Sequence, residues 1–588
     1  MQLNNFIEIY NKYSRILIYI TGFMVLVSLI AIIGFYLSNW WISFFQIVTD
    51  IAIYIFILNE IIKLIFANNF KIHIQERSLE LIILVLLLSQ MLFPQTTIHI
   101  FSIILPNITP QKISLIYLAI IELFLIFIMF LKLIRLTHTL SNIRLHSSAI
   151  IAISFFIIIF IGALLLILPR TYLPGTNYNF LDAFFTSTSA VCVTGLIVVD
   201  TATQFTTTGK LVILLLIQIG GLGIMTLTTF FAFFITGGMS LRARSLVKDL
   251  LSEESLIDIK NLLIRILTYT LVIELIGTLS LYIATVDNIL VYEPEQLFFA
   301  LFHSISAFCN AGFSLYSENL MKESIRDNYL YTSTIMMLIM LGGLGFVVHS
   351  NLTEYFLKKR MNKAFRLKIH TKLVLASTLG LILVGTLLIW SFESYRLFPE
   401  LGLWERLYNS LFWSISARTA GFNLLPTEKL SNSAAMVLIL LMWIGASPGS
   451  TGGGIKTTTI SIVIMALISF MLGKDRTELF KREISRDSIR QSFFVILSSI
   501  LVLGLSSTFL VWLEWNKSPL DLIFEATSAI STVGLSRNIT YFMGDGAKIL
   551  LIFLMFVGRV GVLSFLLSFH RPVEEAKYKF PQENIIVG

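Results

Sequence analysis

The sequence predicts an all-α polytopic membrane protein of about 12 spans, in which four additional transmembrane helices precede four pore-forming repeats. Three observations support this fold class. Apolar residues make up 56% of the chain and charged residues only 13%, whereas soluble proteins carry roughly a quarter charged residues. Apolar runs throughout the chain reach the ~20 residues needed to cross a bilayer. One short motif also recurs four times at a near-constant period.

The N-terminal block, residues 1–147, is predicted to be a four-helix membrane block of uncertain role. Its predicted spans are 16–36, 43–67, 79–93 and 113–136. Four basic residues recur at multiples of three at the end of the last span: Lys132, Arg135, His138 and Arg144. This spacing faintly resembles a voltage sensor, but the excess of positive charge on the cytoplasmic side also explains it. A packing or assembly role is the favoured interpretation.

The rest of the chain repeats a pattern of apolar span, amphipathic half-span, glycine and second apolar span. The predicted repeats are 148–245, 262–360, 370–475 and 488–570, and a cytoplasmic tail follows at 571–588. Each half-span carries a Phe, then Ser-Ala four residues later, then a glycine. These glycines, roughly 110 residues apart, are Gly195, Gly312, Gly421 and Gly534.

The half-spans predict a cation pore. A segment of about ten residues cannot cross the bilayer, so it must enter and return, and irregular backbone at that depth must line water or be buried in protein. Glycine allows the turn, and the carbonyls before it can replace the hydration shell of an ion. The predicted selectivity filter is Val193, Thr194, Gly195, Asn310, Ala311, Gly312, Thr419, Ala420, Gly421, Thr532, Val533 and Gly534.

Three charged residues stand out in apolar surroundings. Arg418 and Glu525 both lie in half-spans, where a lone charge is expensive, so we predict that they pair across repeats three and four and brace the filter. Arg559 lies in an apolar span, where a charge is usually functional. Carbonyl oxygens at a helix end could instead satisfy Arg559.

The Ser-Ala…Gly motifs, the segment 445–460 and the closing residues 585–588 resemble the Trk/Ktr/HKT superfamily of potassium transporters, and most closely the bacterial Ktr/Trk membrane subunit. The resemblance spans residues 150–588. It implies potassium as substrate, a homodimer, and a separate cytosolic nucleotide-binding regulatory subunit that forms a gating ring. Gly195 stands where relatives that prefer sodium carry Ser, which points to potassium.

The second helix of the third repeat is interrupted by glycines and a proline, which disfavour a regular helix. The resemblance implies that this stretch is an intramembrane gate beneath the filter and that Arg559 projects there. A kinked helix that packs tightly on a neighbour is the alternative. The expected gate residues are Gly445, Ser447, Pro448, Gly449, Ser450, Thr451, Gly452, Gly453, Gly454, Lys456 and Arg559.

The basic residues cluster in three connecting segments and the tail, which places both termini on the cytoplasmic side of the cytoplasmic membrane. Membrane topology thus explains the net charge of +8, so no nucleic-acid partner is expected. Membrane lipid is the expected partner of the apolar surface. A serine-hydrolase-like match at 445–449 lacks the strand–turn–helix context, so no enzyme activity and no cofactor are expected; nucleotide would act only through a partner. The predicted function is gated potassium uptake, and the alternative is a sodium- or proton-coupled secondary transporter.

Overall fold

The computed structural model describes residues 2–66, 147–175, 178–223, 258–286, 293–362, 366–396 and 401–568, together with a few isolated positions. The predicted span at 113–136, most of the span at 79–93, the basic residues 132–144 and the tail 571–588 lie outside these ranges. So does the end of the first repeat, from residue 224.

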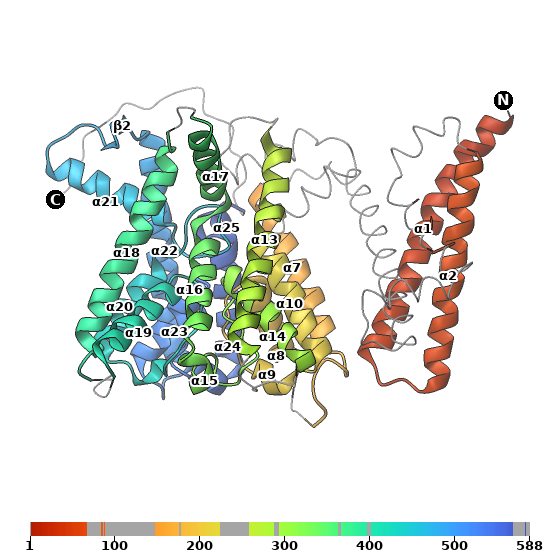
Figure 1. Cartoon of the computed structure of the whole chain (residues 1–588), viewed down its shortest axis with the longest axis horizontal. Helices are drawn as coiled ribbons and strands as arrows, with labels where there is room; N and C mark the ends of the chain where they lie inside the picture. Colours follow the sequence, from red (N-terminus) through yellow and green to blue (C-terminus); the bar gives the residue numbers. More distant parts are fainter. Residues whose placement is uncertain are drawn as a thin grey trace.

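Each repeat supplies a long first helix, a short pore helix and a second helix (Figure 1). The first repeat holds α7 (Ser147–Leu166), α8 (Phe180–Val191) and α10 (Thr207–Leu222). The second holds α13 (Asp258–Val286), α14 (Glu293–Phe308), α16 (Tyr329–Leu344) and α17 (Phe346–Arg360). The third holds α18 (Ile369–Glu393), α19 (Leu403–Ser416), α20 (Asn432–Trp443) and α21 (Thr457–Met471). The fourth holds α22 (Arg486–Leu513), α23 (Pro519–Ile530), α24 (Asp545–Val560) and α25 (Val562–Ser568).

The remaining elements are the N-terminal hairpin, short helices and one small sheet. The hairpin is α1 (Gln2–Gly34) and α2 (Asn39–Ile65), set to one side of the repeats in Figure 1. The short helices are α9 (Thr201–Gln204), α15 (Glu323–Arg326), η2 (Thr427–Lys429) and η3 (Thr540–Phe542). In the described part of the chain, one antiparallel pair of strands, β1 (Glu478–Leu479) and β2 (Arg482–Glu483), departs from an all-α fold. Arg170 joins α1 to the first repeat, because its N–H donates to the Gly34 carbonyl at 2.9 Å.

The second helices of the second and fourth repeats are broken, whereas the sequence predicted a break only in the third repeat. Among the described residues, five helices can cross a membrane by length and hydropathy, and the pairs α16–α17 and α24–α25 also qualify but bend by 98° and 94°. The breaks fall at matching glycines, Gly345 and Gly561, with φ of 90° and 91°, and α10 ends at the equivalent Gly223 with φ of 78°. These values favour glycine, which has no Cβ to clash.

Another set of glycines lets the second helix of three repeats approach its own pore helix. A Cβ on Gly220 would collide with the carbonyl oxygen of Val191, the last residue of α8. Gly342 meets Phe308 and Gly558 meets Ile530 in the same way, at the ends of α14 and α23. In the first, second and fourth repeats, these glycines therefore let the second helix pack against the end of its pore helix.

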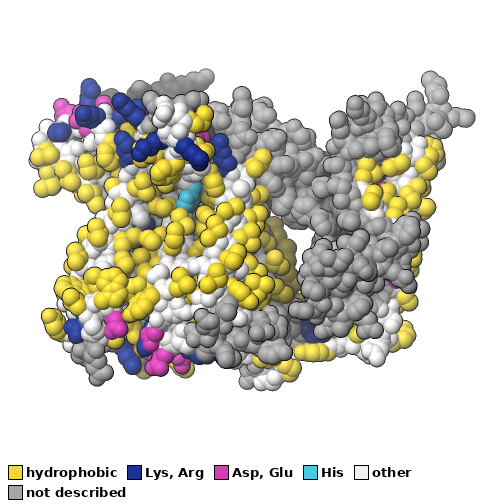
Figure 2. Space-filling model, viewed as in Figure 1, with side chains coloured by type: hydrophobic (Ala, Val, Ile, Leu, Met, Phe, Trp, Pro, Cys, Tyr) yellow, Lys and Arg dark blue, Asp and Glu magenta, His cyan; other side chains and the backbone are white. Residues whose placement is uncertain are grey.

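Charge is unevenly distributed along the bundle. Figure 2 shows Lys and Arg side chains gathered at the end where α17 and the β1–β2 hairpin lie, and a band of apolar side chains between the two ends. The basic last turn of α17 contains Lys358, Lys359 and Arg360. The pore helices lie toward the opposite end in Figure 1. The structure therefore places these basic segments together at one end.

Candidate functional site

Each pore helix ends in a turn with the same uncommon backbone conformation. Two residues before each filter glycine, φ is positive, between 49° and 71°, although none of these residues is glycine. Such conformations cost energy in non-glycine residues and cluster at functional sites. The residues are Val193, Asn310, Thr419 and Thr532, and the glycines that follow have φ between 71° and 90°. Of the twelve predicted filter residues, all but Gly534 are buried.

The four turns form a closed ring. A Cβ on any filter glycine would lie within 3.0 Å of a carbonyl oxygen of the next repeat. A Cβ on Gly195 would contact the carbonyl oxygen of Ala311, and one on Gly534 would contact that of Thr194. A Cβ on Gly312 would lie 2.8 Å from the Ala420 oxygen, and one on Gly421 would lie 2.6 Å from the Val533 oxygen. The ring therefore runs from the first repeat to the fourth in order and closes on the first.

Among the described residues, no group donates a hydrogen bond to the carbonyl oxygens of this ring. They belong to Thr194, Ala311, Ala420 and Val533, whose side chains are completely buried. Within the part of the chain that the structure describes, no N–H or O–H group donates to any of the four oxygens. Buried carbonyls are almost always paired, so four unpaired oxygens around one centre suit the coordination of a cation.

The recurring serine of the motif ties the pore helix to its turn. The Gly195 N–H donates to the Ser189 hydroxyl at 3.0 Å, and the Gly534 N–H donates to the Ser528 hydroxyl at 3.0 Å. In the third repeat, the Ser416 hydroxyl donates to the carbonyl of Phe422. Here one residue fewer separates the serine from the glycine than in the other repeats. The four motifs therefore do not superimpose residue for residue.

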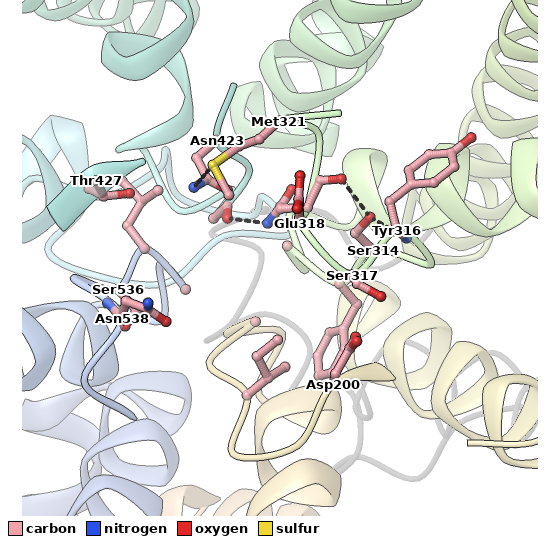
Figure 3. A pocket seen from close by; sticks show the side chains of 18 of the residues that line it. Asp200, Ser314, Tyr316, Ser317, Glu318, Met321, Asn423, Thr427, Ser536 and Asn538 are labelled. Carbon is pink, nitrogen blue, oxygen red and sulfur yellow. Dashed lines mark hydrogen bonds between the residues drawn. The ribbon is translucent and has the colours of Figure 1, made fainter. Parts of the chain in front are cut away.

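A cavity of about 160 Å³ borders the ring and is lined by all four filter glycines. Figure 3 shows how side chains from several loops border it. Three carboxylates, Asp200, Glu318 and Glu428, contribute to the lining, and the described lining contains no Lys or Arg. The approach to the ring from this side is therefore acidic.

The glycine-rich segment leaves the helix as expected and packs on the filter. Residues 444–456 are irregular between α20 and α21. A Cβ on Gly452 would collide with Oγ1 of Thr419, and one on Gly453 would collide with Oγ1 of Thr532. The segment therefore touches the filter of the third and fourth repeats directly.

Hydrogen bonds within this segment stabilise its fold, and others bind it to the second repeat. The Thr451 hydroxyl donates to the Phe308 carbonyl at 3.1 Å, at the end of α14. Further bonds run from Gly445 N to Ile455 O (2.9 Å), Ser447 N to Gly343 O (3.1 Å), Phe346 N to Gly449 O (3.0 Å), and Ser450 Oγ to Ser447 O (2.6 Å). Gly454 adopts a φ of 68°, and the Pro448 carbonyl lies beside Gly345.

Two cationic side chains bind carbonyls of the segment. Arg559 donates to the Thr451 carbonyl and to the Gly220 carbonyl, so it links the fourth, third and first repeats. Gly220 lies in the last turn of α10. The bond to its carbonyl therefore fits the alternative prediction, in which carbonyl oxygens at a helix end satisfy Arg559. Lys456 donates to the Gly452 carbonyl at 2.8 Å.

The predicted pairing of Arg418 with Glu525 is wrong. Glu525 accepts hydrogen bonds within its own repeat, from Ser536 Oγ at 2.5 Å, Arg537 N at 3.0 Å and Thr540 Oγ1 at 2.8 Å. Arg418 donates to Thr378 Oγ1 at 3.4 Å, toward α18. Relative to its filter glycine, Glu525 lies six residues earlier than Arg418, roughly 9 Å along a helix. The two side chains therefore meet different surroundings.

One ion pair at the rim of the repeats was not predicted. Lys548 Nζ of α24 lies 2.8 Å from Asp182 Oδ1 of α8, and both side chains are mostly buried. The two residues are 366 positions apart, so no local pattern connects them. The one feature of the sequence that could have pointed to this ion pair is the acidic residue in the first turn of the pore helix.

Comparisons with known proteins identify a family and a fold. The profile of the family described as "TrkH: Cation transport protein" matches residues 117–579. The Ktr system potassium uptake protein B of Vibrio alginolyticus is 37% identical over 442 residues, which cover 75% of this chain and 94% of that protein. The potassium/sodium uptake protein NtpJ of Enterococcus hirae is 35% identical, covering 76% and 98%. The crystal structure of the potassium transporter TrkH from Vibrio parahaemolyticus shares the fold, with a TM-score of 0.56, 16% identity, and coverage of 83% and 95%.

Proposed function

The chain belongs to the TrkH family of cation transport proteins, and from this premise we propose that it takes up potassium through one pore formed by its four repeats. The ring of four unpaired carbonyl oxygens carries the proposal. Such oxygens replace the water around an ion without adding charge. The four pore helices end at the ring, and their partly negative C-terminal ends favour a cation.

The route starts at the acidic cavity and continues through the ring. Asp200, Glu318 and Glu428 raise the local cation concentration at the outer end. The protein lies in the cytoplasmic membrane with both termini inside, and lipid surrounds the exposed apolar faces. The membrane potential drives uptake with ~2.3 kcal/mol per charge for each 100 mV.

The segment 444–456 and Arg559 act as the gate. The segment lies against Thr419 and Thr532 of the filter, and the Arg559 guanidinium holds its Thr451 carbonyl. A positive charge at this point repels an arriving cation. The gate opens when the segment and Arg559 withdraw. A cytosolic nucleotide-binding subunit controls that movement from the basic end of a homodimer.

A coupled mechanism is the second candidate, and one buried acid favours it. Glu274 of α13 is 4% exposed, accepts from Gln218 at 3.2 Å, and lies 3.9 Å from the Cys309 sulfur beside the filter. A buried carboxylate near an ion path can carry a coupling proton or sodium ion. Reversal potentials separate the two: a potential that follows sodium or pH and ignores potassium supports coupling.

Rubidium uptake by cells without their own potassium uptake tests the proposal. Gly195→Ser places a side chain against the Ala311 carbonyl at a φ of 90°, so it should abolish the preference for rubidium over sodium. Gly380→Ser is the matched control, because no atom lies within 4 Å of a Cβ at this exposed helix position. Unchanged uptake and selectivity in Gly195→Ser would remove Gly195 from the ion path.

A further inference from the structure

One position of the pore helix carries a buried hydrogen-bond acceptor in two of the four repeats. This position directly follows the Phe of the motif and holds His303 in α14 and Glu525 in α23. Both side chains are 0% exposed. The first and third repeats carry Thr186 and Trp413 at the same position.

In the second repeat, His303 binds the loop that follows the filter glycine. His303 Nδ1 lies 2.8 Å from the Phe299 carbonyl and must carry the proton, so Nε2 is an acceptor. Nε2 accepts from the Leu315 N–H at 3.3 Å and from the Ser314 hydroxyl at 3.0 Å. The hydroxyl oxygen accepts in turn from the Tyr316 N–H at 3.0 Å.

The fourth repeat builds the same network with a different side chain. Glu525 Oε1 accepts from the Arg537 N–H and the Ser536 hydroxyl, and the Asn538 N–H donates to that hydroxyl at 3.0 Å. The serine stands two residues after the filter glycine in both repeats, and the N–H donor to the acceptor stands three after it. The imidazole of His303 and the carboxylate of Glu525 therefore play the same structural role, since each binds the loop that follows its filter glycine. We call each of these two hydrogen-bonded links a strap.

The other two repeats have no equivalent strap in the described structure. Thr186 donates its hydroxyl to the Asp182 carbonyl of its own helix at 2.8 Å. Trp413 offers only an N–H donor and cannot accept from a loop N–H. Because the ring runs through the repeats in order, the two straps lie on opposite sides of the filter.

Both strapped loops also reach the third repeat. The Asn319 amide donates to the carbonyl of the filter residue Gly421 at 3.4 Å. Arg537 donates from its guanidinium to the Glu428 carbonyl at 3.3 Å. Ser314 and Tyr316 from one loop and Ser536 and Asn538 from the other border the same cavity (Figure 3). The straps therefore anchor the outer ends of the filter on two sides.

We propose that His303 and Glu525 are positioning residues for ion selectivity, and that the filter is held by two opposite straps instead of four equal turns. The inference rests on the proposed function, because it takes the carbonyl ring as the ion site. An ion is distinguished by size only if the oxygens around it keep their positions. Releasing a strapped loop lets the turn behind it relax, so the ring accommodates sodium more readily.

The test measures rubidium and sodium uptake by the full-length protein in cells without their own potassium uptake, with membrane expression quantified for each variant. His303→Leu and Glu525→Leu remove the acceptor and should lower the rubidium-to-sodium ratio about tenfold. His303→Gln and Glu525→Gln keep an acceptor oxygen and should stay within about twofold of the wild type. Thr186→Val is the matched control at the equivalent position and should not change the ratio.

Wild-type selectivity in both leucine variants would overturn the proposal. Equal loss in Glu525→Gln and Glu525→Leu would also overturn it, since charge and not the strap would then matter. If Glu525→Leu does not reach the membrane, Ser536→Ala removes one donor to Glu525, and an unchanged ratio in it and in His303→Leu overturns the proposal. Failure of the proposed function is a different result: the wild type itself then takes up no rubidium beyond cells without the protein.

Discussion

The ion pair between Lys548 and Asp182 should govern how firmly the fourth repeat closes on the first. The 2.8 Å contact joins the first turn of α24 to the first turn of α8, and the side chains are 13% and 7% exposed. Lys548→Met removes the ammonium and keeps most of the apolar volume. Asp182 is then left as a mostly buried, unpaired carboxylate.

Removing one partner of a buried pair costs about 3–5 kcal/mol. Because Lys548 keeps some exposure, we expect the lower end, about 3 kcal/mol. Replacing both partners, as in Lys548→Met with Asp182→Asn, leaves no unpaired charge and should recover much of the loss. The assay is the melting temperature of the purified protein in detergent for the wild type, both single variants and the double variant.

The expected order places both single variants below the double variant and the double variant near the wild type. The control is the pair of Arg265 with Glu354, which is 44% and 36% exposed; Arg265→Met should change the melting temperature little, because exposed pairs contribute little. A Lys548→Met protein that melts like the wild type, or a double variant as unstable as the two single losses combined, would refute the reasoning.

Two further predictions concern the gate and the outer loops. Arg559→Gln loses charge-assisted bonding to the Thr451 carbonyl, so basal rubidium uptake without a regulatory subunit should rise severalfold; uptake equal to the wild type would argue against a gating role. Burial raises the pKa of Glu514, but hydrogen bonds from Lys517 and the Gly544 N–H outweigh this effect and hold the pKa below its usual value. The stabilisation is therefore present at neutral pH and lost as pH falls through the lowered pKa. Glu514→Gln should lower the melting temperature at pH 7 and match the wild type in acid, and a difference that persists in acid would contradict this cause.

Local features of the sequence predicted the membrane class, the short half-spans and the glycine turns that follow them. Hydropathy, period and glycine spacing are properties of neighbouring residues, so they can be read without knowing which repeats touch. The turn residues Val193, Asn310, Thr419 and Thr532 share their positive φ although their side chains differ. The conformation therefore belongs to the turn that ends each pore helix and not to one kind of side chain.

Tertiary structure alone decided which distant groups meet. Arg418 and Glu525 do not pair, because Arg418 binds Thr378 of α18 and Glu525 binds the loop that follows Gly534. The bonds of Arg559 to Thr451 and Gly220 depend on how three repeats pack. His303 and Glu525 differ in chemistry, so the sequence does not show that they are equivalent. The structure shows it, because the loop after each filter glycine folds back and donates equivalent hydrogen bonds to them. A sequence shows where a charge or an acceptor stands, but packing determines which donor reaches it.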